Sequence, residues 1–190
     1  KIFAEDTRVA GKLLKHFDIQ KKTESFHEHN ENEASDRIIQ LIKSGESIAL
    51  LSDAGAPLIS DPGYPLIQRC IMEDISFTVV PGPSSVINAI ILSGLPSDKF
   101  LFYGFLPKQY EAKRKIATKL QNVDATSIFF ESAKRISKTI SIFSEVLSSD
   151  TKIAICREMT KQHESIYRGT IKEVLKLIQN NEITLLGEFV

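Results

Sequence analysis

The sequence is poor in several features that mark common functional classes. It has two cysteines and four histidines, and its 24 Lys and Arg residues balance its 24 Asp and Glu residues. A net charge of zero argues against a protein that binds nucleic acid non-specifically, although it does not exclude a local basic face. Cys70 and Cys156 stand in apolar surroundings, which is typical of buried thiols rather than of a disulfide or a metal pair.

Further absences narrow the range of functions that the sequence supports. His27 and His29 are close in sequence, but two histidines on a polar segment make a weak metal site, so we expect no metal. No apolar stretch reaches membrane-spanning length and no signal peptide is recognisable, which predicts a soluble cytoplasmic protein. The common glycine-rich nucleotide motifs and the G-x-S-x-G motif are absent, so hydrolysis by a nucleophilic serine is unsupported.

What is present is an alternation of short apolar runs and helical patterns, which predicts an α/β fold. A break at residues 95–98, followed by an aromatic strand, divides the chain into an N-terminal α/β domain (1–97) and a C-terminal α/β domain (98–190). We expect a mostly parallel sheet in the first domain and a mixed sheet in the second. Strands are expected at 47–52, 76–80, 100–105, 126–130, 152–157, 164–170 and from 183 onward.

Small, hydroxyl-bearing and charged residues follow several of these strands. Residues 52–63 are SDAGAPLISDPG, residues 81–85 are PGPSS, and the strands at 126–130 and 152–157 lead into Glu-Ser and Glu-Met-Thr-Lys. Any one of these loops is explained by turn chemistry alone. In open α/β sheets, however, ligands bind beyond the carboxyl ends of the strands, so the loops together predict a pocket.

Seven segments in a fixed order carry a family resemblance. They are EDTR (5–8), HEHNE (27–31), SDAGAPLISDPG (52–63), PGPSS (81–85), LPSDKFLFYGFLP (95–107), FFESAKRI (129–136) and REMTKQHESIYRGT (157–170). Together they resemble the small-subunit ribosomal RNA methyltransferase I group of the tetrapyrrole methylase superfamily, over essentially the whole chain. The resemblance implies a tetrapyrrole methylase-like fold of two α/β domains, with S-adenosylmethionine (SAM) in the cleft between them.

The same resemblance implies a reaction and its partners. Methyl transfer would go to the ribose 2′-hydroxyl of a cytidine in the decoding region of small-subunit ribosomal RNA, within an assembled particle and by a homodimer. The Ser-Asp-Ala-Gly start of the long loop favours RNA over a tetrapyrrole substrate. Two alternatives stay open: a SAM-dependent methylase of a tetrapyrrole-like small molecule, and a non-catalytic ribosome-binding module.

The sequence departs from the family pattern at two places. The family's first strand and its Pro-Thr-Pro-Ile-Gly-Asn-type loop are absent, which would remove a central strand and part of the cofactor site. Leu186 stands where the family has a lysine.

Positional matches to the family motifs imply the site residues. The cofactor would contact Asp53, Ala54, Gly55, Leu58, Ile59, Ser84, Ser85, Phe130, Glu131 and Met159. A base would help a ribose hydroxyl attack, and the candidates are Asp6, Glu31, Glu131 and Glu158. For each of these carboxylates the competing interpretation is a helix cap or an ion pair with a nearby arginine.

RNA binding requires phosphate contacts from Lys and Arg side chains. Three basic clusters in the second half supply candidates, namely Lys108, Lys113, Arg114, Lys134, Arg135, Arg157 and Lys161. Solvated helix faces are the competing interpretation of these clusters. Tyr103 and Phe105 have rings that would suit base stacking, although core packing is the more common role of strand aromatics.

Overall fold

The computed structural model describes residues 1–190, and the chain forms two compact units, Lys1–Ser84 and Ser85–Val190. The sequence places the domain boundary after Ser97, whereas the structure groups helix α4 (Ser85–Ser93) with the second unit. Packing explains the difference, because α4 contacts strands β5, β6 and β7 of that unit. No helix combines the length and the apolar character needed to cross a membrane.

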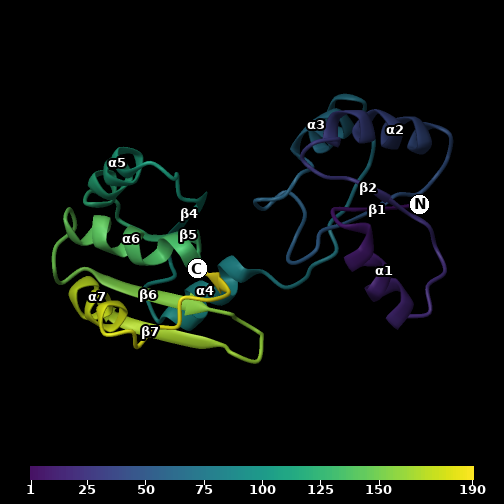
Figure 1. Cartoon of the computed structure of the whole chain (residues 1–190). Helices are drawn as coiled ribbons and strands as arrows, with labels where there is room; N and C mark the ends of the chain where they lie inside the picture. The colour runs from purple at the N-terminus through teal and green to yellow at the C-terminus, as the bar shows by residue number, and fades with distance from the viewer. The chain divides into compact units, whose positions relative to one another are not determined.

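The first unit is built on a three-stranded parallel sheet in the order β2-β1-β3. Helices α2 and α3 lie side by side (Figure 1), and they bury Phe3, Phe26, Ile38 and Leu66 in one apolar core. The parallel pairing confirms the expectation for this half. The elements are β1 (Ile2–Ala4), α1 (Thr7–His16), β2 (Thr23–Ser25), α2 (Glu31–Lys43), β3 (Ala49–Leu51) and α3 (Tyr64–Met72).

The strand expected at 76–80 does not form, and this expectation was wrong. Residues 75–84 have no regular secondary structure. Val79 and Val80 are 70% and 87% exposed, so the apolar run lies in solvent rather than in the sheet. A strand needs a neighbour to pair its backbone N–H and C=O groups, and β1 is the only strand that β3 pairs with in this sheet.

The second unit holds a five-stranded mixed sheet in the order β4-β5-β8-β6-β7, as expected. Strands β4 and β5 are parallel, and β8 runs antiparallel to both β5 and β6. The elements after α4 are β4 (Phe100–Phe105), α5 (Tyr110–Leu120), β5 (Thr126–Ser132), α6 (Ala133–Ser144), β6 (Lys152–Arg157), β7 (Ser165–Thr170), α7 (Ile171–Gln179) and β8 (Glu188–Phe189). The last strand, expected from residue 183, therefore has only two residues.

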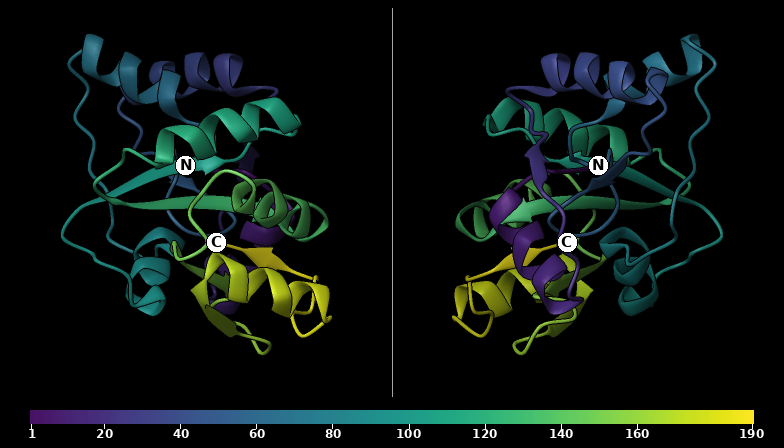
Figure 2. Two further views of the ribbon diagram at one scale, coloured as in Figure 1. Left: turned by 90° about the vertical axis from the view of Figure 1, so that its left-hand side faces the viewer. Right: turned by 90° about the vertical axis from the view of Figure 1, so that its right-hand side faces the viewer.

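Successive side chains of this sheet alternate between two apolar layers. Phe129, Ile155 and Phe189 pack with α5, α6 and α7 on one face, whereas Ile128 and Val190 pack with α4 on the other. Figure 2 shows α5, α6 and α7 following one another along their side of the unit. Both cysteines are free and buried as expected, and burial raises the pKa of the Cys156 thiol to about 11.

Candidate functional site

In the first unit, two candidate loops leave the same edge of the sheet. Strands β1 and β3 are parallel and pair Ala4 with Leu51, so the two strands end at the same level of the sheet. The chain leaves β1 into residues 5–8 and leaves β3 into the long loop 52–63. Parallel pairing thus brings two of the family-like motifs side by side, which sequence separation alone does not reveal.

Reciprocal hydrogen bonds tie these two loops together. The backbone N–H of Asp6 donates to Oδ1 of Asp53 at 3.1 Å, and the backbone N–H of Asp53 donates to Oε2 of Glu5 at 3.3 Å. The N–H of Glu5 also donates to the carbonyl of Leu51 at 3.1 Å. The side chain of Asp53 is therefore held by the loop after β1, although it lies on the loop after β3.

Asp6 serves as the N-cap of helix α1. Its carboxylate accepts hydrogen bonds from the backbone N–H of Arg8 at 2.8 Å and from the Arg8 guanidinium at 2.5–3.1 Å. The hydrogen bonds from Arg8 hold the pKa of Asp6 well below its usual range. A carboxylate with so low a pKa is a poor proton acceptor.

Two other carboxylates at this edge, Glu5 and Asp61, have raised rather than lowered pKa values. Burial, followed by the neighbouring charges of Asp61, Asp53 and Asp6, raises the pKa of Glu5. Burial and the charge of Asp53 likewise raise the pKa of Asp61, even though Ser52 donates a hydrogen bond to it. The edge is therefore rich in negative charge, and such a group of carboxylates attracts a cationic ligand.

The long loop is held in an uncommon backbone conformation. Leu58, Ser60 and Gly63 have φ angles of 72°, 66° and 135°. A Cβ atom added at Gly63 would lie 2.8 Å from Cδ1 of Leu58, so any other residue would displace Leu58 and strain the backbone at this φ. The carboxylate of Glu31 accepts a hydrogen bond from the N–H of Gly63 at 2.8 Å, which fixes the end of the loop to the start of α2.

In the second unit, β4, β5 and β6 all point toward one edge of the sheet. Phe189 of β8 pairs with Glu131 on one side and with Arg157 on the other, which sets the ends of β5 and β6 level. The ring of Phe130 makes edge-to-face contacts with the rings of Phe102 at 4.8 Å and Phe105 at 5.4 Å. Tyr103 stacks on Phe129, but Tyr103 and Phe105 are 41% and 59% exposed, so neither side chain is part of the core.

Glu131 lies at the centre of a buried polar network. Its carboxylate accepts hydrogen bonds from Lys113 at 2.8 Å, from Thr139 at 2.7 Å and from the backbone N–H of Ser132 at 2.9 Å, and it forms an ion pair with Arg135 at 2.6 Å. Lys113 also donates a hydrogen bond to Thr139. Burial by itself raises the pKa of Glu131, but the hydrogen bonds from Lys113, Thr139 and Ser132 outweigh burial and leave the pKa lowered.

The turn after β6 is fixed in a similar way. Arg157 donates hydrogen bonds to the carbonyls of Leu186 at 2.7 Å and His163 at 2.9 Å. Glu158 has a φ angle of 50°, and it accepts hydrogen bonds from the backbone N–H of Glu188 at 2.8 Å and from Lys161 at 3.1 Å. These two bonds lower the pKa of Glu158. Met159 follows on this turn and is half-buried.

All four carboxylates singled out as candidate bases have structural partners. Asp6 caps a helix, Glu31 anchors Gly63, Glu131 is enclosed by cations, and Glu158 ties β8 to the turn after β6. Three of them have lowered pKa values. The competing interpretation as caps and ion pairs therefore describes their contacts in this structure better than a free base does.

The candidate RNA contacts separate into exposed and buried side chains. Lys108, Arg114, Lys134 and Lys161 are exposed, and Arg135 is partly exposed in its ion pair with Glu131. Lys113 and Arg157 are 2% and 8% exposed, respectively, so neither reaches a phosphate, and these two assignments were wrong. Spacing along the chain did not reveal this, because α5 turns Lys113 inward onto the Glu131 carboxylate.

The residues expected to contact the cofactor fall on both units. Asp53, Ala54, Gly55, Leu58 and Ile59 lie on the loop after β3, where Asp53, Ala54 and Gly55 are exposed. Ser84 and Ser85 stand at the junction between the units, Phe130 and Glu131 lie near the end of β5, and Met159 follows β6. No set of three or more His, Cys, Asp or Glu side chains is placed to hold a metal ion.

The chemistry of the first-unit loop fits SAM, which carries a sulfonium and an ammonium group. Glu5, Asp53 and Asp61 supply negative charge around that loop. A Cβ atom added at Gly55, whose φ is 78°, would meet no atom within 4 Å, so the backbone there is open to a ligand. Glu5 and Asp61 were not among the candidate residues, although both belong to the quoted motifs.

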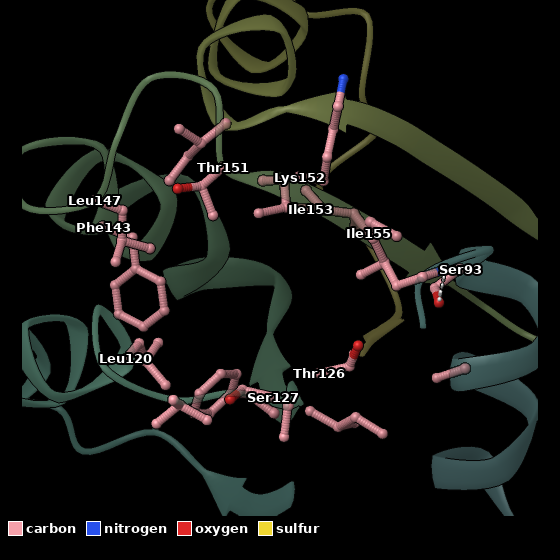
Figure 3. A pocket seen from close by; sticks show the side chains of 18 of the residues that line it. Ser93, Leu120, Thr126, Ser127, Phe143, Leu147, Thr151, Lys152, Ile153 and Ile155 are labelled. Atoms are coloured by element: carbon pink, nitrogen blue, oxygen red, sulfur yellow. Dashed lines mark hydrogen bonds between the residues drawn. The ribbon is translucent and has the colours of Figure 1, made fainter. Parts of the chain in front are cut away.

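The main cavity of the second unit lies elsewhere. Its volume is about 810 Å³, and it opens between β5 and β6 (Figure 3). Of the residues expected to contact the cofactor, Glu131 alone lines it. The cavity and the strand-end loops are therefore separate features.

Comparison with known proteins identifies the relatives of this chain. Residues 1–175 match the family model described as Tetrapyrrole (Corrin/Porphyrin) Methylases. The chain is 43% identical over 189 residues to "Ribosomal RNA small subunit methyltransferase I" of Halalkalibacterium halodurans and 41% identical to the protein of that name of Vibrio cholerae. These alignments cover 100% of this chain but only 64% and 66% of the relatives, so the chain spans just under two thirds of their length.

Solved structures agree on the fold. Diphthine synthase superposes with a TM-score of 0.73 at 14% identity, covering 100% of this chain and 77% of that one. The methyltransferase CobJ gives a TM-score of 0.60 at 13% identity, covering 90% of this chain and 86% of that one. At such low identity the likeness concerns the fold alone.

Proposed function

Because the chain belongs to the tetrapyrrole methylase family, we propose that the protein transfers a methyl group from SAM to small-subunit ribosomal RNA. The observation that carries this proposal is identity of 41–43% over 189 residues to relatives named for that activity. In its finer form, the proposal names the ribose 2′-hydroxyl of a cytidine in the decoding region as the acceptor. The ordered motifs and the RNA-type loop 52–63 support this choice of substrate.

The residues proposed to hold the cofactor are those of the strand-end loops. SAM supplies a methyl group that its sulfonium already makes electrophilic. Asp53 would face the cationic part, since its carboxylate is held in place by the N–H of Asp6, and the open backbone at Gly55 would allow close approach. Leu58 and Ile59 continue the same loop, and Ser84, Ser85, Phe130, Glu131 and Met159 complete the proposed set.

The acceptor hydroxyl must lose a proton during transfer, and a positioned base accelerates such a step by about 10²–10⁴-fold. Glu5 and Asp61 suit this role better than the four carboxylates chosen from sequence, because their pKa values are raised. Asp6, Glu131 and Glu158 have lowered pKa values and are already hydrogen-bonded. We therefore place the proton acceptor at Glu5, directly after β1, or at Asp61, on the loop after β3.

The RNA would be held by the exposed cations of the second unit, Lys108, Arg114, Lys134 and Lys161. Because the net charge is zero, recognition by a local patch within an assembled small-subunit particle is favoured over non-specific binding. A homodimer, which the family resemblance implies, and a cytoplasmic location, which the sequence predicts, complete the proposal.

Calorimetry with SAM and the full-length protein tests the cofactor site. Asp53→Asn should weaken SAM binding at least about tenfold, because a hydrogen bond or ion pair to a charged group is lost. Asp150→Asn is the matched control, since Asp150 is exposed and lies in the turn before β6. Equal affinity for SAM in the two variants would show that Asp53 does not contact the cofactor. Undetectable SAM binding by the unaltered protein would contradict the enzyme proposal.

Mapping of 2′-O-methyl groups on small-subunit ribosomal RNA tests the substrate. Cells that lack the gene should lose one ribose methyl group in the decoding region and regain it when the full-length protein is supplied. If every ribose methyl group persists in the deletion strain, the ribose 2′-hydroxyl of small-subunit ribosomal RNA is not the acceptor. SAM binding together with intact ribose methylation would favour a small-molecule methylase instead.

A further inference from the structure

The C-terminal end of helix α1, in the first unit, carries a group of lysines without partners. Lys12 and Lys15 lie on the helix, and Lys21 and Lys22 lie on the loop 17–22 that leads from it to β2. All four side chains are exposed, and none of their ammonium groups forms an ion pair or a hydrogen bond. Asp18 is the one carboxylate on this part of the chain, from residue 7 to residue 23.

The other Lys and Arg side chains of the first unit are all paired. Carboxylates outnumber cations in this unit, so most cations find a partner. The pairs are Lys1 with Glu46, Arg8 with Asp6, Arg37 with Glu24, Lys43 with Glu73 and Arg69 with Asp36. The four lysines at the end of α1 are therefore segregated from the negative charge of the unit, and they create a local positive potential.

Backbone hydrogen bonds fold the loop 17–22 back onto the helix. Asp18 has a φ angle of 55°, and its N–H donates to the carbonyl of Lys15 at 3.2 Å. The N–H of Ile19 donates to the carbonyl of Leu14 at 2.8 Å. Figure 1 shows the chain turning back beyond this end of α1. The turn brings lysines that are six and seven positions from Lys15 back beside it.

A cleft lies between α1 and the returning loop. Its volume is about 410 Å³, and its walls include Lys15, Lys21 and Lys22 together with the hydroxyl-bearing Thr23. Asp18 lines the same cleft. Because three ammonium groups face one carboxylate, the cleft attracts an anion, and a phosphate group offers the oxygens that such donors bind.

Two further features favour nucleic acid over a small anion. Lys12 lies one turn before Lys15 on the same side of α1, so the positive surface continues beyond the cleft, as a chain of phosphates requires. Phe17 is 63% exposed, and its ring contacts the ring of His16 edge to face at 5.0 Å. Exposed aromatic rings next to cations stack on the unpaired bases of single-stranded RNA.

The cleft lies away from the proposed cofactor loop. Helix α1 begins beyond Asp6, directly after β1, and a helix of ten residues is about 15 Å long. Thr23, at the end of the returning loop, pairs with Ile2 at the start of β1. The cleft is therefore near the start of the strands, whereas the cofactor loop follows their ends. These lysines are placed to position a substrate and take no part in methyl transfer.

We propose that this lysine cleft, with Lys12 and Phe17 beside it, is a second RNA-binding surface. It holds the phosphate backbone of a single-stranded segment that flanks the methylated nucleotide. The proposal rests on the proposed function, in which the substrate is RNA, and it assigns to the first unit a share of the binding that the sequence motifs place in the second unit alone.

Binding of small-subunit ribosomal RNA to the full-length protein at several salt concentrations tests the proposal. Lys15→Gln together with Lys21→Gln should weaken binding at least about tenfold near physiological salt, and should reduce the slope of log affinity against log salt by about 1.5, because two phosphate contacts are lost. Arg37→Gln together with Lys43→Gln is the matched control, since it removes the same charge from the same unit but from cations that are already paired. The control should keep the slope of the unaltered protein.

Protection of lysines from acetylation, read by mass spectrometry, locates the contact without any substitution. Small-subunit ribosomal RNA should slow acetylation of Lys15, Lys21 and Lys22 and leave Lys172 of α7 unaffected. Equal protection by inorganic phosphate would assign the cleft to a small anion. Equal protection by vesicles of anionic phospholipid would assign it to a membrane surface. Either result would overturn the proposal.

SAM binding, measured on the same proteins, separates failure of this proposal from failure of the proposed function. Affinity for SAM should be equal in all of them, because no altered residue lies on the loops 5–8 and 52–63. If the Lys15 and Lys21 variant binds and methylates RNA with unchanged affinity and salt slope, this proposal alone is wrong. An equal loss in the matched control would also contradict it. If the unaltered protein binds SAM but not ribosomal RNA, both proposals fail.

Discussion

The Nζ atom of Lys113 lies 2.8 Å from the Oε2 atom of Glu131, and both side chains are almost fully buried. This ion pair joins α5 to the end of β5, and Thr139 and Arg135 extend it to α6. Burying two charges is costly unless each finds a partner, so the pair is a fixed part of the second unit. Phe130, which precedes Glu131, is thereby held at a strand end proposed to contact the cofactor.

Removing the lysine should destabilise the protein strongly. Lys113→Met leaves the Glu131 carboxylate buried and short of its main partner, which should cost about 3–5 kcal/mol of unfolding free energy. Urea denaturation followed by circular dichroism measures this change. Lys115→Met is the control, because Lys115 is exposed on the same helix, and it should change stability by no more than about 0.5 kcal/mol. Equal stability of the two variants would contradict the interpretation.

The same pair should make stability depend on pH. Glu131 has a folded-state pKa below its usual value of 4.5, so folding favours its charged form. Its contribution is therefore present above that value and is lost as the pH falls through the lowered pKa. Glu131→Gln should be less stable than the unaltered protein at neutral pH, and the difference should shrink under acid conditions. A difference that stays constant with pH would show that charge is not the cause.

A side chain at Gly63 should destabilise the first unit. Gly63→Ala places a Cβ atom 2.8 Å from Leu58 at a φ of 135°, so it should destabilise the first unit by about 1–3 kcal/mol and weaken SAM binding. Gly11→Ala is the control on the same unit, since Gly11 lies within α1 with open space around it. That variant should gain about 0.5–1 kcal/mol. Thermal unfolding measures the stability of both variants, which should fall for Gly63→Ala and rise for Gly11→Ala.

Exposed and buried cations should differ in their effect on RNA binding. Lys134→Ala should weaken binding of the full-length protein to small-subunit RNA and reduce the slope of log affinity against log salt by about 1. Lys172→Ala should leave the slope unchanged, because Lys172 is an exposed lysine of α7 outside the basic clusters. Titrations at several salt concentrations measure both slopes. An equal loss in both variants would indicate a diffuse charge effect rather than a patch.

Local patterns in the sequence determined the element types, because apolar periodicity and turn residues act over short distances. They predicted the α/β class, the mixed sheet of the second unit and the loops at 52–63 and 158–161, whereas Glu131 and Ser132, expected beyond a strand end, are the last residues of β5. The pattern failed at 76–80, where the apolar run has no strand to pair with. A strand depends on its neighbour, and no local pattern specifies the neighbour.

Tertiary structure alone decided which charged side chains are free and which are enclosed. Lys113 belongs to a basic run and Glu131 to a family motif, but only the packing of α5 and α6 on β5 shows that they neutralise each other. Likewise, the structure brings Glu5, Asp53 and Asp61 together, and burial, with the neighbouring negative charges adding to it, raises the pKa values of Glu5 and Asp61. Charge and pairing interactions act across space between distant segments, so the sequence names the residues while the fold assigns their partners.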